Sequence, residues 1–241
     1  MSAPAARRVD APQDALRARE RVWLFDLDNT LHDAGAWVFG QMNHTMQAYL
    51  VETMGLAPDD AGALRGRYWR RYGSTLLGLV RHHGVRPAHF LHETHRLPGL
   101  EERVTGHRHD LAAIGRLRGR RIVLTNAPRA YAMRVLGALG IARLFDRVLS
   151  IEDMTMFGHW RPKPDRRTLR RVARRLGVHP SRCVLVEDSL ENIVAARRVG
   201  MQPVWMQRFA RRGAHDGPRV DRWSMRPTGV RVIRNLRSLV G

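Results

Sequence analysis

The chain of 241 residues contains little cysteine, little lysine and no long hydrophobic run. Its single cysteine, Cys183, lies within an apolar segment, which excludes a disulfide framework and predicts a reducing compartment, the cytoplasm. No apolar run approaches the ~18 residues of a membrane-spanning helix. Residues 1–20 lack the apolar centre of a signal peptide and are predicted to form an N-terminal tail.

Lysine is nearly absent: 41 of the 42 Lys and Arg residues are arginine, and the remaining one is Lys163. An ammonium group is a compact point charge, so it can touch a phosphate oxygen and a carboxylate together in a tight site where a planar guanidinium does not fit. We therefore predict a functional role for Lys163. Chance survival of a lysine in the proline-rich loop 161–165 is the alternative.

An apolar run at residues 21–26, predicted as a buried strand, ends in an acidic segment with Asp26, Asp28 and Thr30. Carboxylates two residues apart at the end of a strand project to the same side, at the sheet edge where α/β folds bind ligands. Such a pair suits Mg²⁺ with a phosphate, and it offers a carboxylate nucleophile beside a second acid. Ordinary turn chemistry at a helix start is the alternative.

Two further β-like runs also end in polar residues. One is followed by Thr125 and Asn126, and the other by Glu187, Asp188 and Ser189. Three strand ends therefore carry groups suited to phosphate and metal, which is harder to explain by turn chemistry than one.

These segments together resemble the four motifs of the haloacid dehalogenase (HAD) superfamily of phosphotransferases. In chain order the segments are Asp26-Leu-Asp-Asn-Thr30, Thr125-Asn126, Lys163-Pro164 and Glu187-Asp188-Ser189. The resemblance spans residues 21–206. It departs from the common pattern at Asn29, where glycine is frequent, and at Asn192, where many members have another acid.

The resemblance implies a role for each motif residue. Asp26 would be the nucleophile that forms an aspartyl-phosphate, and Asp28 the acid and base. Thr125 and the amide of Asn126 would hold the transferring phosphoryl oxygens. Lys163 would offset the negative charge shared by the nucleophile and the phosphoryl group.

The resemblance also implies a Mg²⁺ site. Its ligands would be Asp26, the backbone carbonyl of Asp28, and Asp188, with Glu187 as a ligand or as a neighbour of the ligands. Dehalogenases of the superfamily need no metal and usually lack the second acid, so Asp28 and Asp188 favour phosphoryl transfer. Asp153 is acidic and close to this region in sequence, but an ordinary turn role is favoured for it.

The alternation of strands and helices predicts an α/β fold with a Rossmann-like parallel sheet. The predicted strands are 21–26, 121–125, 147–151, 182–187 and 203–206, and the predicted helices 108–118, 128–139, 165–176 and 189–199.

The interval between Asp26 and Thr125 far exceeds the ~30 residues of a simple βαβ unit. We predict that residues 34–104 form an inserted α-helical cap on a core made of 21–33 and 105–241. The predicted cap helices are 36–54, 58–72, 74–83 and 87–95, and residues 208–221 are predicted as an exposed loop before a terminal strand or helix.

The segments 33–37, 72–80 and 125–128 resemble the pyrimidine 5′-nucleotidase branch of HAD phosphatases, which implies a nucleotide substrate such as UMP or CMP. Trp37 and Phe39 would stack on the base or simply anchor the first cap helix. The alternatives are a phosphatase for another small phosphate ester, such as phosphoglycolate or a sugar phosphate, and a phosphomutase.

The formal charge of +20 supports a hypothesis of another class, a basic nucleic-acid-binding protein on an inactive HAD scaffold. The arginines are scattered, however, and no zinc-finger, RNP or basic-zipper pattern accompanies them. Seven of the twelve histidines lie between His82 and His109, but complementary ligand clusters are missing, so ordinary cap histidines are favoured over a metal site. The oligomeric state stays open.

Overall fold

The computed structural model describes residues 20–156, 158–209 and 227–240. The predicted tail, apart from Glu20, and most of the predicted loop 208–221 lie outside these ranges. The core is a six-stranded sheet with the order β3-β2-β1-β6-β7-β8, and all of its neighbouring strands are parallel. This confirms the predicted α/β class. The strands are β1 (Val22–Phe25), β2 (Arg120–Leu124), β3 (Arg147–Leu149), β6 (Cys183–Glu187), β7 (Gln202–Met206) and β8 (Arg231–Ile233).

The first strand, β1, lies in the middle of the sheet between β2 and β6. All four of its residues are buried, which is why the sequence there is a continuous apolar run rather than an alternating one. Phe25 pairs with Val123 on β2 and with Val186 on β6, so the three carboxyl ends are nearly level. The polar residues that follow these strands are thereby brought to one edge.

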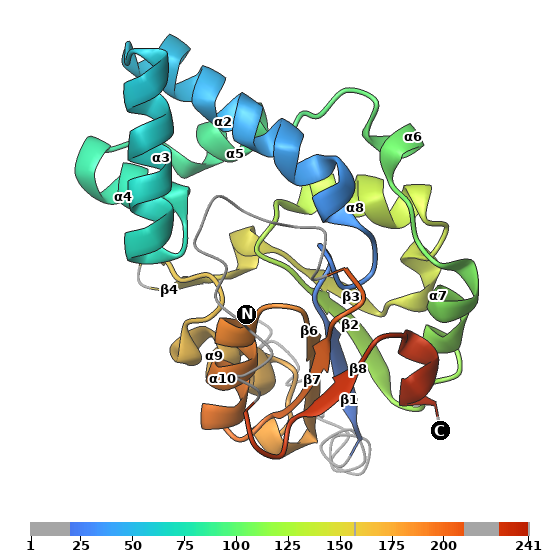
Figure 1. The fold of residues 1–241 in the computed structure, drawn as a ribbon. Helices are drawn as coiled ribbons and strands as arrows, with labels where there is room; N and C mark the ends of the chain where they lie inside the picture. Colours follow the sequence, from blue (N-terminus) through green and yellow to red (C-terminus); the bar gives the residue numbers. More distant parts are fainter. Residues whose placement is uncertain (1–19, 157, 210–226, 241) are drawn as a thin grey trace, which may run out of the picture.

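Helices cover both faces of the sheet (Figure 1), and each face has its own apolar cluster. Trp23 and Phe25 pack with α7 (Arg108–Ile114) and α8 (Arg129–Ala138), whereas Val22 and Leu24 face α9 (Arg166–Arg175) and α10 (Leu190–Arg198). Leu169 and Val172 of α9 are buried, and the six arginines of this helix are exposed, as its amphipathic sequence predicts.

Between β1 and β2 the chain forms six α-helices, of which four share a third apolar cluster that includes Leu50, Leu64, Leu79 and Phe90. Figure 1 shows these four helices together at one end of the molecule, above the sheet. They are α2 (Val38–Met54), α3 (Pro58–Tyr72), α4 (Thr75–His83) and α5 (Pro87–Thr94), followed by the short α6 (Leu100–Arg103).

Three of these helices end at glycines with positive φ, namely Gly55, Gly73 and Gly84. A side chain is strained in this left-handed conformation, so glycine defines the helix ends. Between β3 and α9 a short antiparallel pair, β4 (Thr155–Met156) and β5 (His159–Trp160), precedes the loop that holds Lys163. In the described part of the chain, no helix has the length and apolar character needed to span a membrane.

Candidate active site

Three acidic side chains meet at the carboxyl ends of β1 and β6. Asp26 follows β1, Glu187 ends β6, and Asp188 comes next in the chain. One carboxylate oxygen from each lies within 4.8 Å of the others, and within the described ranges no other group of acids, histidines or cysteines has this metal-ligand geometry. Carboxylate oxygens are the ligands that Mg²⁺ prefers, so the donor set fits this cation.

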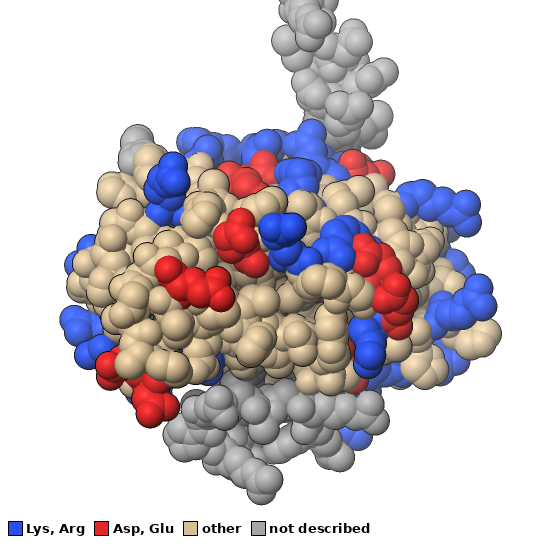
Figure 2. Space-filling view, turned by 90° about the horizontal axis from the view of Figure 1, so that it is seen from above, with Lys and Arg blue, Asp and Glu red and all other residues tan. Residues whose placement is uncertain are grey.

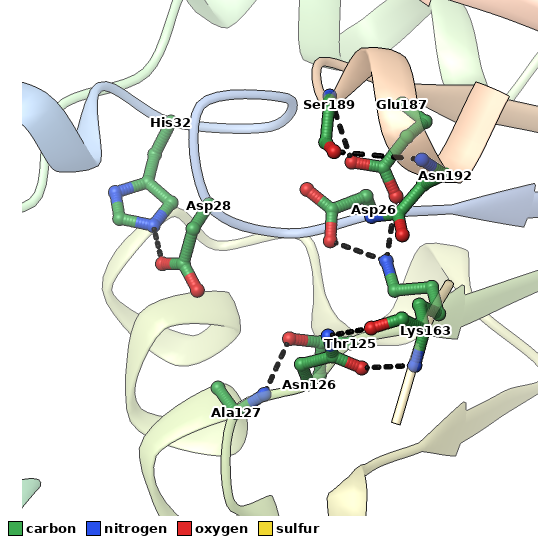
Figure 3. Close-up of polar contacts among 10 residues, drawn as sticks. All are labelled: Asp26, Asp28, His32, Thr125, Asn126, Ala127, Lys163, Glu187, Ser189 and Asn192. Atoms are coloured by element: carbon green, nitrogen blue, oxygen red, sulfur yellow. Dashed lines mark hydrogen bonds and ion pairs between the residues drawn. The ribbon is translucent and has the colours of Figure 1, made fainter. Parts of the chain in front are cut away.

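Lys163 reaches this cluster from the loop before α9. Its Nζ donates to Asp26 Oδ1 and to Glu187 Oε2, both at 2.7 Å (Figure 3). Burial disfavours the charged ammonium, but the attraction of Asp26 and Glu187 outweighs burial and raises the pKa of Lys163 above its usual value. Lys163 therefore stays protonated at neutral pH.

The carboxylates of the cluster are hard to ionise together. Burial, and then repulsion by Glu187, raise the pKa of Asp26 to about 7 against the lowering effect of Lys163. Burial, followed by repulsion from Glu187 and Asp26, also raises the pKa of Asp188 well above its usual value. Three carboxylates facing one ammonium leave an excess of two negative charges when all are ionised, which a divalent cation would balance.

The backbone of Lys163 is fixed by Asn126, the residue that follows Thr125 after β2. Asn126 Nδ2 donates to the Lys163 carbonyl and Lys163 N donates to Asn126 Oδ1, both at 2.9 Å. The Asn126 side chain thus positions the lysine loop. The resemblance implies a phosphate contact for the amide of Asn126, and sequence reasoning missed this reciprocal side-chain pairing with Lys163.

The hydroxyl of Thr125 is buried at the same edge, where its Oγ1 accepts a hydrogen bond of 3.0 Å from Ala127 N. Because the hydroxyl is the acceptor in this contact, its own proton is free to be donated to a phosphoryl oxygen. This geometry suits the role that the resemblance implies.

Asp28 points away from the Asp26–Lys163 pair (Figure 3). Its Oδ1 accepts a 2.6 Å hydrogen bond from the Tyr131 hydroxyl and lies 2.9 Å from His32 Nε2. The Asp28 carboxylate only accepts, so His32 is the donor in this pair. Burial opposes ionisation of Asp28, but the contacts with His32 and Tyr131 prevail and lower its pKa.

Sequence reasoning missed both partners of Asp28. For His32 the signal in the sequence is its position, four residues after Asp28. The structure buries the His32 side chain completely. Tyr131 is 103 positions away from Asp28, and nothing in the sequence indicates that the two residues meet.

The segment after β6 supports Glu187. Ser189 N donates to Glu187 Oε1 at 3.1 Å, while the other oxygen of Glu187 accepts from Lys163. Both oxygens of Glu187 therefore have protein partners, which favours a neighbour of the metal ligands over a ligand. Asn192 is buried, and its Oδ1 has no hydrogen-bond partner among the residues that the structure describes.

Trp37 and Phe39, the predicted base-stacking residues, pack against the apolar cluster of α7 and α8. The guanidinium of Arg103 lies 5.9 Å from the centroid of the Trp37 ring. These contacts favour the alternative in which both aromatic residues anchor the first helix of the insertion.

Several histidines of the insertion pair with tyrosines. Tyr68 contacts His83, Tyr72 contacts His82, and Tyr49 contacts His89 through hydroxyl-to-ring-nitrogen hydrogen bonds of 2.6–3.1 Å. Within the described ranges, the group with metal-ligand geometry contains no histidine of the insertion.

A family model described as haloacid dehalogenase-like hydrolase matches residues 21–200. Over 85% of the chain and 78% of the relative, the sequence is 29% identical to a plasmid-encoded phosphoglycolate phosphatase of Cupriavidus necator. A shorter match is 39% identical to the fructose-1-phosphate phosphatase YqaB of Escherichia coli. It covers 33% of the chain, which spans only 40% of that relative's length.

Solved structures show the same fold. A HAD phosphatase from Thermococcus onnurineus superimposes with a TM-score of 0.58 at 20% identity, covering 91% of this chain and 95% of that one. A HAD family hydrolase from Deinococcus radiodurans gives a TM-score of 0.54 at 23% identity, covering 92% and 94%.

Proposed function

Because the chain belongs to the haloacid dehalogenase-like hydrolase family, we propose that it is a Mg²⁺-dependent phosphatase that hydrolyses a small phosphate monoester through an aspartyl-phosphate. One observation carries this proposal: the Asp26 carboxylate is in contact with the buried Lys163 ammonium beside two further acids at the sheet edge. The relatives described above are named as phosphatases, which supports the same reaction class.

In the proposed reaction the negative charge of the bound phosphoryl group favours the protonated form of Asp28, against the lowering effect of His32 and Tyr131. Asp26 attacks phosphorus, and the bond from phosphorus to the leaving-group oxygen breaks while the Asp28 carboxyl gives its proton to that oxygen. Asp28 then takes a proton from water, and the resulting hydroxide attacks the aspartyl-phosphate. The bond between phosphorus and the Asp26 oxygen breaks, which releases inorganic phosphate and restores the carboxylate.

The other residues of the site stabilise negative charge. Lys163 and Thr125 would donate to the phosphoryl oxygens, as charge spreads over them in the transition state. Asp26, the carbonyl of Asp28 and Asp188 would hold Mg²⁺, which when bound supplies charge neutralisation of the phosphoryl group. Glu187 keeps Lys163 in place through its 2.7 Å contact.

The contacts of Asp28 suit a general acid whose carboxyl group is held in a fixed orientation while part of it stays exposed. Its side chain is 16% exposed, whereas that of His32 is fully buried behind it. Both hydrogen bonds described for Asp28 use Oδ1, which leaves Oδ2 for the leaving group. We propose that His32 and Tyr131 orient Asp28 in this way.

For the substrate we favour a small ester such as a sugar phosphate or phosphoglycolate, because the relatives carry these names. The pyrimidine nucleotide interpretation rests on short sequence segments, and the packing of Trp37 and Phe39 removes one argument for it. We further propose that residues 34–104, which include α2–α5, act as the cap that selects the substrate.

The nucleic-acid hypothesis has less support. On the face shown in Figure 2, basic side chains are interspersed with acidic ones over the surface. The alternation favours a surface with a general attraction for anions over a continuous track for a phosphate backbone.

The test is phosphate release from fructose 1-phosphate, phosphoglycolate, UMP, CMP and p-nitrophenyl phosphate, with Mg²⁺ or with EDTA. We expect turnover that requires Mg²⁺ and is lost in Asp26→Asn. The matched control is Asp146→Asn, a substitution at the opposite end of the sheet, which should keep activity. Activity that survives Asp26→Asn, or salt-sensitive oligonucleotide binding without any turnover, would contradict the proposal.

A further inference from the structure

His95 connects the helical insertion, through Tyr131, with Asp28, the proposed general acid. It follows α5, and its ring lies edge-on to Tyr131 with 5.8 Å between the ring centroids. Tyr131 in turn donates its hydroxyl proton to Asp28 at 2.6 Å. One side chain of the helical insertion therefore stands next to the hydrogen-bonded pair that would serve the leaving group.

The hydrogen bonds of His95 determine which ring nitrogen carries the proton. Nδ1 lies 3.0 Å from the carbonyl of Leu91 and 3.0 Å from Thr94 Oγ1. The Thr94 hydroxyl already donates its only proton to the carbonyl of Phe90 at 2.7 Å, so it can only accept from His95. Both neighbours of Nδ1 are thus acceptors, and the proton is on Nδ1.

The remaining nitrogen, Nε2, is an acceptor when the ring is neutral. Burial lowers the pKa of His95 to about 4, although the nearby Asp28 carboxylate acts in the opposite direction. The side chain is half-buried, and within the described residues Nε2 has no protein partner. At neutral pH the insertion therefore presents an unused hydrogen-bond acceptor beside the acid.

The charges that act on His95 and Tyr131 come from carboxylates and from one guanidinium. The carboxylates of Asp28 and Glu152 both act on His95. The guanidinium that acts on the neighbouring Tyr131 belongs to Arg134, which is held by both oxygens of Glu101 at 2.6 and 2.8 Å. A carboxylate on the leaving group would meet acids and a neutral acceptor here, whereas a hydroxyl would find a partner.

We propose that His95 Nε2 accepts a hydrogen bond from a hydroxyl of the leaving group, so that the preferred substrates are phosphate esters of polyols rather than phosphorylated carboxylic acids. This inference rests on the proposed function, because it assigns a substrate class to the same site. His95 contacts the substrate and not the reacting phosphorus, so it acts on specificity.

The test measures binding without turnover, by calorimetry with Mg²⁺ on an Asp26→Asn background. The probes are fructose 1-phosphate and phosphoglycolate. The variants are His95→Phe, which keeps an aromatic ring, and His92→Phe, at an exposed histidine within α5. We expect His95→Phe to weaken fructose 1-phosphate binding about tenfold, the effect of one lost hydrogen bond to a desolvated group. Phosphoglycolate binding should change less than about twofold, and His92→Phe should change neither.

Equal weakening of both ligands, no change in either, or tighter binding of phosphoglycolate than of fructose 1-phosphate before substitution at His95 would each overturn the inference. If His95→Phe does not fold, His95→Gln, which places an amide oxygen near the same position, should retain more selectivity than His95→Ala. Failure of the proposed function is recognised differently: the folded wild-type protein would then hydrolyse no phosphate ester, whatever the calorimetric binding measurements show.

Discussion

Lys163 Nζ lies 2.7 Å from Asp26 Oδ1, although 137 positions separate the two residues in the sequence. Both side chains are almost fully buried, and the lysine also contacts Glu187. A single compact cation is thus placed between two carboxylates in a chain whose other 41 Lys and Arg residues are all arginine. This relationship gives the unusual lysine a physical reason, because two short contacts to buried carboxylates suit a compact ammonium better than a planar fork.

Lys163→Arg should therefore abolish most of the activity while keeping the charge. We expect kcat to fall at least about 100-fold, the size of effect seen when one preorganised donor to a transition-state oxygen is displaced. Steady-state kinetics with p-nitrophenyl phosphate measure the loss.

The matched control for this exchange is Arg161→Lys, two positions earlier. Arg161 forms a partly exposed ion pair of 3.0 Å with Asp165, which a lysine can replace. We expect its kcat to stay within about twofold, since such pairs contribute little. Wild-type activity in Lys163→Arg would show that the shape of the cationic group at position 163 does not affect catalysis.

Magnesium should stabilise the protein through the acidic cluster. At about one hundred times its Kd, a ligand adds about 2.7 kcal/mol to the free energy of unfolding. In a chain of this size that corresponds to a Tm increase of roughly 5–10 °C. Thermal denaturation with Mg²⁺ and with EDTA gives the shift directly.

Asp188→Asn should remove this Mg²⁺ response without lowering the Tm in EDTA. The substitution also removes a buried carboxyl whose pKa is raised by burial and then by repulsion from Glu187 and Asp26. Glu191→Gln is the control, since Glu191 is a neighbouring exposed acid outside the cluster. A Mg²⁺ shift that persists in Asp188→Asn would place the metal elsewhere.

The strand ends were predictable from the sequence because burial and chemistry leave local signals there. The continuous apolar run of β1 indicates a central strand, and the polar residues directly after it indicate the edge where ligands bind. The same reasoning applies to β2 and β6, so the neighbourhood of Asp26, Thr125 and Asp188 follows from a parallel sheet.

The contacts that organise this site were not predictable, because they join residues far apart in the chain. Asn126 fixes the Lys163 backbone across 37 positions, and Tyr131 reaches Asp28 across 103. The sequence predicts either a strand or a helix where β8 lies, since the three residues Arg231–Ile233 carry too short a pattern to distinguish the two.

Asp28→Asn should separate the two halves of the proposed reaction. Nitrophenolate leaves without needing a proton, so Asp26 can still be phosphorylated by p-nitrophenyl phosphate, but the water of the second step lacks its base. We expect a burst of one nitrophenol per protein followed by very slow turnover, and a mass increase of one phosphoryl group on the intact protein. Asp26→Asn should show neither burst nor adduct, and steady turnover by Asp28→Asn without a burst would assign the base elsewhere.

The structure gives Asp153 a role in stability rather than in catalysis. Its carboxylate accepts from Ser150 N at 3.1 Å and pairs with Arg129 at 2.6 Å and Arg175 at 2.9 Å. Burial raises the pKa of Asp153, but the hydrogen bond from Ser150 and the two arginines outweigh it, and the net pKa is lowered. The charged form is therefore the one that the fold stabilises.

For an acid with a lowered pKa in the folded state, the added stability is present above the unfolded-state pKa of 3.8 and is lost as the pH falls through the folded-state value. Asp153→Asn should thus lower the free energy of unfolding by about 1 kcal/mol at pH 7, as expected for charge-assisted hydrogen bonds on a partly exposed surface. Urea denaturation should show this difference shrinking below about pH 4, where Asp153 of the unfolded chain begins to bind a proton that the folded protein still excludes. The exposed Glu52→Gln provides the comparison, with little change at either pH. A difference that grows as the pH falls would have the wrong sign for a carboxylate held in its charged form.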